Sequence, residues 1–168
     1  TGIKQVEALA EKIPSLGISV IYSSALKRAY YSAKILTEKL KKLIIQDRGL
    51  NERSFGDFEG KLRVDIEKEL EEKGQTLLTS SPVNGETLHM FRNRVMEAYN
   101  AILKKHPGET ILIVCHGGVM QLLIAHFHAE ELNKNEVGFQ FANASIYIFH
   151  HSENIYTEKA IEERSSFC

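Results

Sequence analysis

The sequence predicts a three-layer α/β/α sandwich with a mainly parallel central sheet. Short apolar runs, typical of buried strands, alternate along the chain with segments whose apolar residues recur at helical spacing. Such alternation is typical of helices that cover both faces of a parallel sheet. No internal repeat, low-complexity tract or Pro/Gly-rich linker interrupts the 168 residues. We therefore expect residues 1–168 to form a single domain.

The first third of the chain predicts a helix, a strand and a second helix. GIKQVEALAEKI at residues 2–13 has apolar residues at helical spacing, and a proline and a glycine then end the helix. ISVIY at residues 18–22 is a short apolar strand. Ser23 and Ser24 offer helix-capping hydroxyls before the amphipathic segment at residues 25–42, which we expect to be helical.

The middle of the chain predicts a second strand, an irregular loop and two further helices. LIIQ at residues 43–46 is the strand, and DRGLNERSFGDFEG follows it as irregular chain. We expect a helix at about residues 61–73, a loop at residues 75–85, and an amphipathic helix at residues 87–106. A Pro-Gly pair ends the last of these.

The last third predicts a third buried strand, a helix and a pair of strands. TILIVC at residues 110–115 is the strand, and VMQLLIAHF at residues 119–127 is the helix. ASIYIF (144–149) and IYTEKA (155–160) are two strands joined by a short polar turn. That turn is HHSEN (150–154), so both histidines of this stretch are expected in the turn.

Polar side chains follow three of the predicted strands. Arg28 follows the first strand, Glu52 follows the second, and His116 follows the third. Asp57 and Glu59 lie in the same loop as Glu52. Because the carboxyl ends of parallel strands meet at one edge of the sheet, where ligands gather, we expect an arginine, a carboxylate and a histidine to converge there.

A histidine at a strand-to-helix junction can be a packed core residue, a metal ligand or a catalytic group. The two glycines after His116, Gly117 and Gly118, permit a close backbone approach, and the following helix offers free N–H groups and a positive dipole end. This geometry suits an anion, and phosphate above all. The pattern is neither GxGxxG nor GxxxxGK[ST], so it does not support dinucleotide or Walker-type nucleotide binding.

Other chemistries fit this junction less well. Cys115 cannot pair with its neighbour His116, because adjacent residues of a strand point to opposite faces, and we expect it to be a small core residue. No histidine or cysteine spacing resembles a zinc site, so we expect no metal and no cofactor. The guanidinium of Arg28, in contrast, matches the oxygens of a phosphate.

The composition limits the partners of the protein. Twenty-one Lys and Arg against 22 Asp and Glu give a formal charge of −1, which argues against nucleic acid. No apolar run reaches the roughly 18 residues of a membrane span, and the first residues do not resemble a signal peptide. Cys115 and Cys168 form no disulfide framework, so we expect a reducing, cytoplasmic location. The sequence leaves a homodimer open.

Four stretches, in this order, closely resemble the successive motifs of the histidine phosphatase superfamily, the phosphoglycerate-mutase-like proteins. They are SSALKRAYYSAKIL, LNERSFGDFEG, NGETLHMFRNRV and ILIVCHGGVMQLL. The opening TGIKQVEALAEKI resembles that family's first helix, and FANASIYIF resembles its late strand. The resemblance therefore covers nearly the whole chain, and four ordered motifs make it specific.

The resemblance implies phosphoryl transfer through a phosphohistidine, without a metal. Arg28 would bind the phosphate, His116 would hydrogen-bond the transferring group as the second histidine of the site, and Glu52 would donate a proton to the leaving oxygen. Gly117 would contact the substrate through its backbone, and Glu86 falls at a substrate-binding position whose role varies. The physical basis is stabilisation of dispersed negative charge together with general acid catalysis. The implied partner is a small phosphorylated metabolite.

One motif of the family is absent from the 168 residues. The family begins with a strand that ends in Arg-His-Gly, whose histidine is the nucleophile, and this sequence contains no such tripeptide. The chain is then either an N-terminally incomplete copy of an active enzyme or a natural protein without the nucleophile. In both cases we expect it to form no phosphohistidine. We also expect the missing first strand to leave a gap or an exposed edge in the sheet.

The length of one connection bears on the activity. Counting both ends, 26 residues run from Lys61 to Glu86. The glycolytic mutases carry a long insertion there, whereas the short connection resembles the broad-specificity phosphatases and those acting on α-ribazole phosphate. We therefore expect a phosphatase, with mutase chemistry as the alternative within the family. A noncatalytic phosphate-binding module, a pseudophosphatase, is the alternative from another class.

Overall fold

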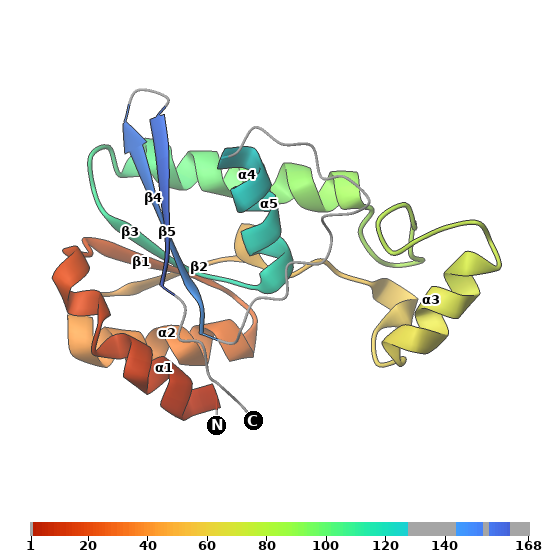
Figure 1. The fold of residues 1–168 in the computed structure, drawn as a ribbon, viewed down its shortest axis with the longest axis horizontal. Helices are drawn as coiled ribbons and strands as arrows, with labels where there is room; N and C mark the ends of the chain where they lie inside the picture. The colour runs from red at the N-terminus through yellow and green to blue at the C-terminus, as the bar shows by residue number, and fades with distance from the viewer. Residues whose placement is uncertain (1, 128–143, 153–154, 162–168) are drawn as a thin grey trace.

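The computed structural model describes residues 2–127, 144–152 and 155–161 (Figure 1). In chain order its helices and strands are α1 (Gly2–Ala10), β1 (Val20–Ser24), α2 (Lys27–Leu40), β2 (Ile44–Asp47), α3 (Arg63–Glu71), α4 (Leu88–Lys105), β3 (Ile111–Val114), α5 (Gly117–Phe127), β4 (Ile146–Ser152) and β5 (Ile155–Ile161). Three short 3₁₀ helices are η1 (Ile13–Leu16), η2 (Arg48–Leu50) and η3 (Gly56–Phe58). Each predicted helix and strand is present, within a few residues of its expected bounds. None of the described helices is long and apolar enough to cross a membrane.

β1 is the centre of a three-stranded parallel sheet with the strand order β2-β1-β3. Tyr22 of β1 stands opposite Ile45 of β2 on one side and Ile113 of β3 on the other. Parallel neighbours require a crossover connection, and α2 supplies the one between β1 and β2. β4 and β5 form a separate antiparallel pair. The parallel sheet is therefore the framework that the alternating pattern predicts.

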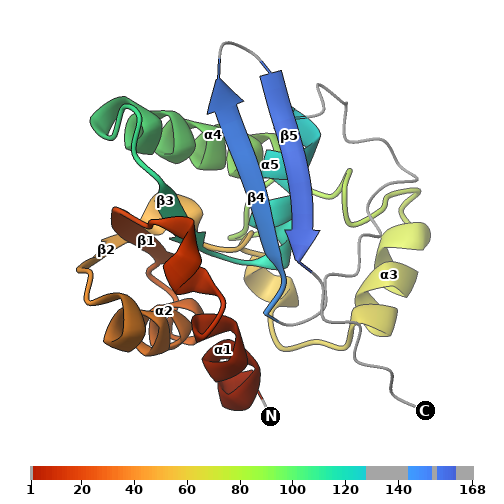
Figure 2. The ribbon, with the colours of Figure 1, turned by 60° about the vertical axis from the view of Figure 1, so that its left-hand side comes forward.

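Successive residues of β1 bury their side chains on opposite faces of the sheet. Ile21 packs in one core cluster with Leu36 of α2, whereas Tyr22 packs with Ile102 of α4. This alternation follows from the two-residue repeat of a strand. Helices α1 and α2 cover the first face, and α4 and α5 cover the other (Figure 2). The predicted three-layer α/β/α sandwich is confirmed.

β4 adds to the core on the α1–α2 side of the sheet. Ile146 is buried in the same cluster as Ile21, and Ile148 packs against that cluster together with Leu112 and Val114 of β3. Residues 146 and 148 share a face because they are two apart in a strand. Within the described residues, β3 pairs with β1 and with no other strand, so β3 is an edge strand of this sheet.

Two serines that the sequence suggests as helix caps belong to a strand instead. Ser23 and Ser24 are the last residues of β1, and α2 begins at Lys27 with Leu26 in the N-cap position. Both serines continue the ladder with β2, where Ser23 stands opposite Gln46. The sheet pairing therefore extends two residues further than the apolar run and moves the start of the helix along the chain.

The expected position of the histidine pair near the C-terminus is wrong. His150 and His151 lie in β4 rather than in the turn, opposite Thr157 and Tyr156 of β5. The antiparallel ladder continues through these polar residues, because backbone pairing needs no apolar side chains. The connection between the strands is reduced to residues 153–154, which lie outside the described residues.

The packing of β1 predicts a large effect of truncating its central side chain. We expect Ile21→Ala to lower the free energy of unfolding by about 2–5 kcal/mol, because Ile21 is 0% exposed and its removal leaves a cavity. Leu43→Ala is the matched control, since Leu43 is 87% exposed just before β2 and its loss should change stability by about 0.5 kcal/mol or less. Urea unfolding followed by circular dichroism measures both. An equal loss of unfolding free energy in the two variants would contradict the central position of β1.

Candidate active site

Three polar side chains meet where β1, β2 and β3 end. Arg28 is the second residue of α2, Glu52 follows β2 and η2, and His116 lies between β3 and α5. Arg28 Nε donates a hydrogen bond to His116 Nδ1 at 3.1 Å. The Glu52 carboxylate accepts one from the backbone N–H of Gly118, two residues after His116, at 3.1 Å. The structure thus brings together the three residues that the sequence analysis placed at the strand ends.

His116 is a buried, neutral imidazole. Only 8% of the residue is exposed, and Nε2 lies 2.8 Å from the hydroxyl of Ser24, which is itself fully buried. Burial, followed by the positive charge of Arg28, lowers the pKa of His116 to about 4. At pH 7 the ring therefore carries no charge, and Arg28 is the cation of this pair.

The carboxylate of Glu52 caps the N-terminus of α5. Its Oε2 accepts from Gly118, and its Oε1 accepts from the N–H of Arg53 at 3.0 Å. The first turn of a helix has unpaired N–H groups and a positive dipole end, which favour a negative charge. A Cβ at Gly118 would collide with the carboxylate, so this approach requires glycine. Gly117, the expected substrate contact, is exposed at the start of the same helix.

Arg94 of α4 holds the backbone of the loop that carries Glu52. Its Nη1 donates to the carbonyl oxygens of Arg48, Gly49 and Asn51 at 3.2, 2.9 and 3.1 Å. Its Nη2 reaches the carbonyl of Glu52 at 3.4 Å. A guanidinium has five N–H donors in one plane, so a single side chain satisfies several carbonyls that turn inward together. The position of Glu52 therefore depends on Arg94.

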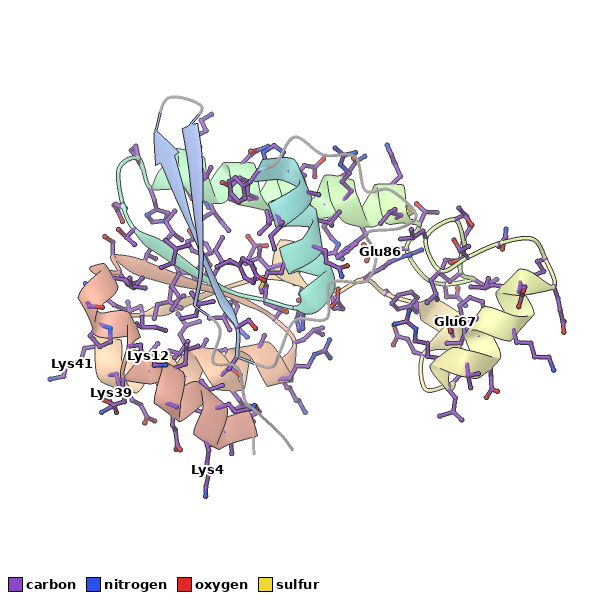
Figure 3. All side chains as sticks on the ribbon, viewed as in Figure 1. Lys4, Lys12, Lys39, Lys41, Glu67 and Glu86 are labelled. Carbon is purple, nitrogen blue, oxygen red and sulfur yellow. The ribbon has the colours of Figure 1, made fainter. Side chains whose placement is uncertain are left out.

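Glu86 in turn holds Arg94. Its two carboxylate oxygens accept from Arg94 Nε and Nη2 at 2.7 and 2.6 Å, and one of them also accepts from the N–H of Ser54 at 3.0 Å. Burial acts to raise the pKa of Glu86, but the hydrogen bonds and charges of Arg94, Ser54 and Arg53 outweigh it and lower the pKa below its ordinary value. Figure 3 shows Glu86 at the junction between α4 and the segment carrying α3. Both oxygens thus face protein donors, and a contact of Glu86 with substrate stays a prediction.

A second arginine ties the same loop to the chain before α4. Arg53 is 7% exposed, and its guanidinium donates to the carbonyl oxygens of Leu77, Ser80 and Glu86 at 2.6, 3.1 and 2.9 Å. Burial lowers the pKa of Arg53, and the charge of Glu86 opposes this shift. Arg53 and Arg94 therefore anchor the two sides of Glu52.

Two glycines allow the loops on either side of α3 to touch. Gly56 has a φ of 53°, and a Cβ there would collide with the carbonyl of Val83. A Cβ at Gly85 would lie 2.9 Å from the carbonyl oxygen of Ser54, which accepts from the N–H of Glu86 at 2.8 Å. The FGDFEG and NGET motifs thus build a backbone contact beside Glu52.

Sequence reasoning did not identify Asn51, Arg53 or Arg94. A polar loop residue and an arginine on a helix are exposed in most proteins, so neither draws attention in a sequence. Helical spacing gives no signal for the Glu86–Arg94 contact, because Glu86 precedes Thr87, the N-cap of α4, and lies outside the helix that carries Arg94.

The remaining candidates of the sequence analysis lie elsewhere. Cys115 packs against the α4–α5 core, as expected, and burial raises the pKa of its thiol to about 12. His106 contacts the hydroxyl of Tyr22, and the ring of His126 packs against Tyr99. In the part of the chain that the structure describes, no three His, Cys, Asp or Glu side chains gather as a metal site would require.

Comparison with known proteins places this arrangement in a family. The sequence profile of the histidine phosphatase superfamily (branch 1) matches residues 1–163. Phosphoglycerate mutase-like protein 4 of Arabidopsis thaliana is 36% identical over 129 residues, which cover 73% of this chain and 56% of that protein. The metal-independent phosphoserine phosphatase of the same plant is 30% identical over 156 residues, 89% of this chain and 63% of that protein. The chain thus spans less than two thirds of either relative. The solved structure of YhfR from Bacillus stearothermophilus matches with a TM-score of 0.82 and 26% identity, covering 95% of this chain and 81% of that one.

The Arg28–His116 contact predicts an unusually acidic histidine. We expect His116 to titrate near pH 4 and Arg28→Gln to raise the midpoint, because the variant removes a like charge from the ring. Between pH 4 and the ordinary value of 6.5 the unfolded chain binds more protons at His116 than the folded chain does, so the protein loses stability at this residue as the pH falls through that range.

NMR titration of the His116 ring measures the midpoint. Arg63→Gln, whose side chain pairs with Glu67 on α3, should leave it unchanged. An unchanged midpoint in Arg28→Gln would show that the contact is absent in solution.

The Arg94–Glu86 pair predicts a stability loss that an exposed pair does not. We expect Arg94→Gln to lower the free energy of unfolding by about 1–3 kcal/mol, because it removes the guanidinium that donates to the inward carbonyls and to both oxygens of Glu86. Arg63→Gln, which breaks an exposed i,i+4 pair, is the control and should lose about 0.5 kcal/mol or less.

Acid titration of stability tests the same pair. The lowered pKa of Glu86 contributes stability above about pH 4.5, its ordinary value, and this contribution is lost as the pH falls through the folded-state pKa. Glu86→Gln should therefore flatten the acid side of the stability curve. Equal losses in Arg94→Gln and Arg63→Gln would mean that Arg94 does not hold the loop.

Proposed function

Because the chain belongs to the histidine phosphatase superfamily, we propose that the complete protein hydrolyses phosphate monoesters of small metabolites through a phosphohistidine. The contact of Arg28 with His116, beside the N-terminus of α5, is the observation that supports this most directly. A guanidinium, an imidazole and helix N–H groups in one place match the charge and the acceptor oxygens of a phosphoryl group.

Arg28 is the proposed phosphate ligand. The residue is exposed, so a phosphate reaches its guanidinium without rearrangement of the core. The planar fork of N–H donors fits two phosphate oxygens at once and stabilises the charge that spreads over them during transfer. His116 would hydrogen-bond the same group, and Gly117 would offer its backbone at the start of α5.

Glu52 is the proposed general acid. In its protonated form it would give its proton to the oxygen of the leaving alcohol as the P–O bond breaks. The carboxylate that remains is the form that accepts hydrogen bonds from the N–H groups of Gly118 and Arg53. These donors would stabilise the product state of the proton transfer.

Glu86 is proposed to act on this chemistry through Arg94. Since both of its carboxylate oxygens accept from Arg94, it holds the guanidinium that orients the loop of Glu52. We therefore propose that Glu86 is a positioning residue, and its contact with substrate stays a prediction of the sequence.

The nucleophile is the part of the proposed mechanism that the 168 residues do not supply. They contain no Arg-His-Gly. Of the histidines whose side chains the structure describes, which are His89, His106, His116 and His126, only His116 contacts Arg28. We propose that this chain alone forms no phosphohistidine.

Hydrolysis is favoured over mutase chemistry by the connection between Lys61 and Glu86. Its 26 residues contain α3 and a few turns, which resembles the compact phosphatases. The relatives include both a mutase-like protein and a phosphatase named for phosphoserine. A small phosphorylated metabolite remains the proposed substrate, and the cytoplasm the proposed location.

Hydrolysis of p-nitrophenyl phosphate tests the proposal on two proteins, the 168-residue chain and the full open reading frame that contains it. We expect no turnover by the chain, and turnover by a full protein that includes an Arg-His-Gly. In the active form, Glu52→Gln should lower kcat by about 10²- to 10⁴-fold, as the loss of a general acid does. Glu67→Gln on α3, an exposed glutamate paired with Arg63, is the matched control and should leave kcat unchanged.

Two outcomes would contradict parts of this proposal. Turnover by the 168-residue chain that vanadate inhibits and His116→Ala abolishes would show that the chain supplies its own nucleophile. A full protein that binds phosphate without turnover would favour the noncatalytic phosphate-binding module.

A further inference from the structure

The ring of His116 ends a chain of side-chain contacts, of which the one with Ser24 is buried. Nε2 lies 2.8 Å from Ser24 Oγ, and Ser24 Oγ lies 2.9 Å from Asn51 Oδ1. Asn51 Oδ1 also accepts from the backbone N–H of Ala25 at 3.0 Å. Ser24 Oγ accepts from the backbone N–H of Leu26 at 3.1 Å. Two backbone donors therefore enter this chain from the segment between β1 and α2.

These donors determine where every hydrogen in the chain lies. The N–H of Ala25 can only donate, so the oxygen of the Asn51 amide must face it. An amide oxygen can only accept, so the single hydroxyl hydrogen of Ser24 points to Asn51. Ser24 must then accept from His116, which places the imidazole hydrogen on Nε2. On the other side of the ring, Arg28 donates to Nδ1, which requires a lone pair there. Both sides of the ring select the same tautomer.

We propose that Ser24 and Asn51 are positioning residues that keep the hydrogen of His116 on Nε2 and leave Nδ1 unprotonated, facing Arg28. The consequence for ligand binding rests on the proposed function, which puts a phosphate next to Arg28 and His116. Neither residue is expected to touch that phosphate, because Ser24 is fully buried behind the ring and the Asn51 side chain contacts Ser24 and Ala25.

The tautomer makes oxyanion binding a proton-coupled event. A phosphate monoester dianion has only acceptor oxygens, and an unprotonated Nδ1 cannot donate to them. For His116 to hydrogen-bond the phosphate, Nδ1 must take a proton from solvent, and the hydrogen bond from Arg28 to Nδ1 must break. Arg28 Nε–H is then free to donate to the anion, while Ser24 continues to accept from Nε2. One proton is taken up for each dianion bound.

The charged groups around the ring oppose this uptake when no anion is bound. Arg28 from α2 lies against Nδ1, and the carboxylate of Glu52, from the loop after η2, is turned to the N–H of Gly118. Ser24 and Asn51 are uncharged, and the neighbouring Cys115 stays a thiol because burial raises its pKa to about 12. The lowered pKa of His116, about 4, agrees with this balance. A dianion bound beside Arg28 would instead favour the protonated, positively charged ring.

NMR of the histidine ring nitrogens in the 168-residue chain tests the placement of the hydrogen. The signals of His116 are assigned as those that disappear in the His116→Gln variant. We expect the Nε2–H tautomer and a slowly exchanging Nε2–H signal, because that hydrogen is bonded to a buried oxygen. Ser24→Ala should abolish the slow exchange. Ser23→Ala is the matched control, since Ser23 is equally buried in the same strand but donates to the backbone carbonyl of Ser24. The proposal is overturned if the hydrogen is found on Nδ1. It is also overturned if the Nε2–H signal exchanges as slowly in Ser24→Ala as in Ser23→Ala.

If Ser24→Ala does not fold, Asn51→Asp tests instead which ring nitrogen of His116 carries the hydrogen. The variant keeps an acceptor for Ser24 and Ala25 and adds a negative charge to the chain of contacts. We expect the protected Nε2–H signal to remain and the titration midpoint of His116 to rise by about one pH unit. Loss of the protected signal, or an unchanged midpoint, overturns the proposal.

Sulfate tests the proton uptake, because it is a tetrahedral dianion that carries no hydrogen and does not titrate near neutral pH. At pH 7.5 we expect saturating sulfate to convert the His116 ring to its imidazolium form and to shift the amide signal of Gly118. A shifted Gly118 amide with a neutral ring overturns the proton coupling. If sulfate shifts no signal of Arg28, Gly118 or His116, the anion site of the proposed function is absent, and so is the proton uptake. The serine variants still test the placement of the hydrogen on His116 in that case.

Discussion

One guanidinium holds the part of the molecule on which the candidate site depends. The loop after β2 turns four carbonyl oxygens toward Arg94, and carbonyls turned inward without donors would strongly disfavour this conformation. Arg94 satisfies them together, and the Glu86 carboxylate balances its charge with two parallel hydrogen bonds. Because the neighbouring Val95 is fully buried in the α4–α5 core, the loop is tied to the packed side of the sandwich.

The site joins the two helical layers at the sheet edge. Arg28 comes from α2 on one face of the sheet, whereas Glu52 is held by α4 and caps α5 on the other. His116 follows β3, its ring contacts Arg28, and Glu52 contacts the backbone two residues further on, at Gly118. Parallel strands place these segments side by side, since all their carboxyl ends lie at one edge. Glycine at position 118 then lets the Glu52 carboxylate reach the first turn of α5.

The electrostatics of this edge combine a cation, an anion and a neutral ring. Arg28 and Glu52 bring opposite charges, and the buried His116 adds none, because burial and Arg28 lower its pKa to about 4. Backbone groups direct two of the side chains at this edge: the N–H of Ala25 donates to the amide oxygen of Asn51, and the N–H of Gly118 donates to the carboxylate of Glu52. Backbone donors move little, so they orient the side chains that they meet.

The sequence by itself determined the layers, the parallel sheet and the segment ends at which Arg28, Glu52 and His116 stand, because hydrophobic periodicity and the alternation of strands with helices can be read locally along the chain. It did not determine that Arg94 gathers the loop, that Asn51 directs the hydroxyl of Ser24, or that Ser24 turns from capping a helix to contacting His116. A serine hydroxyl can bond to its own backbone or to a distant ring, and local preference does not distinguish the two. Only the tertiary structure decided these contacts, because their partners lie in segments far apart along the chain, from position 24 to position 116.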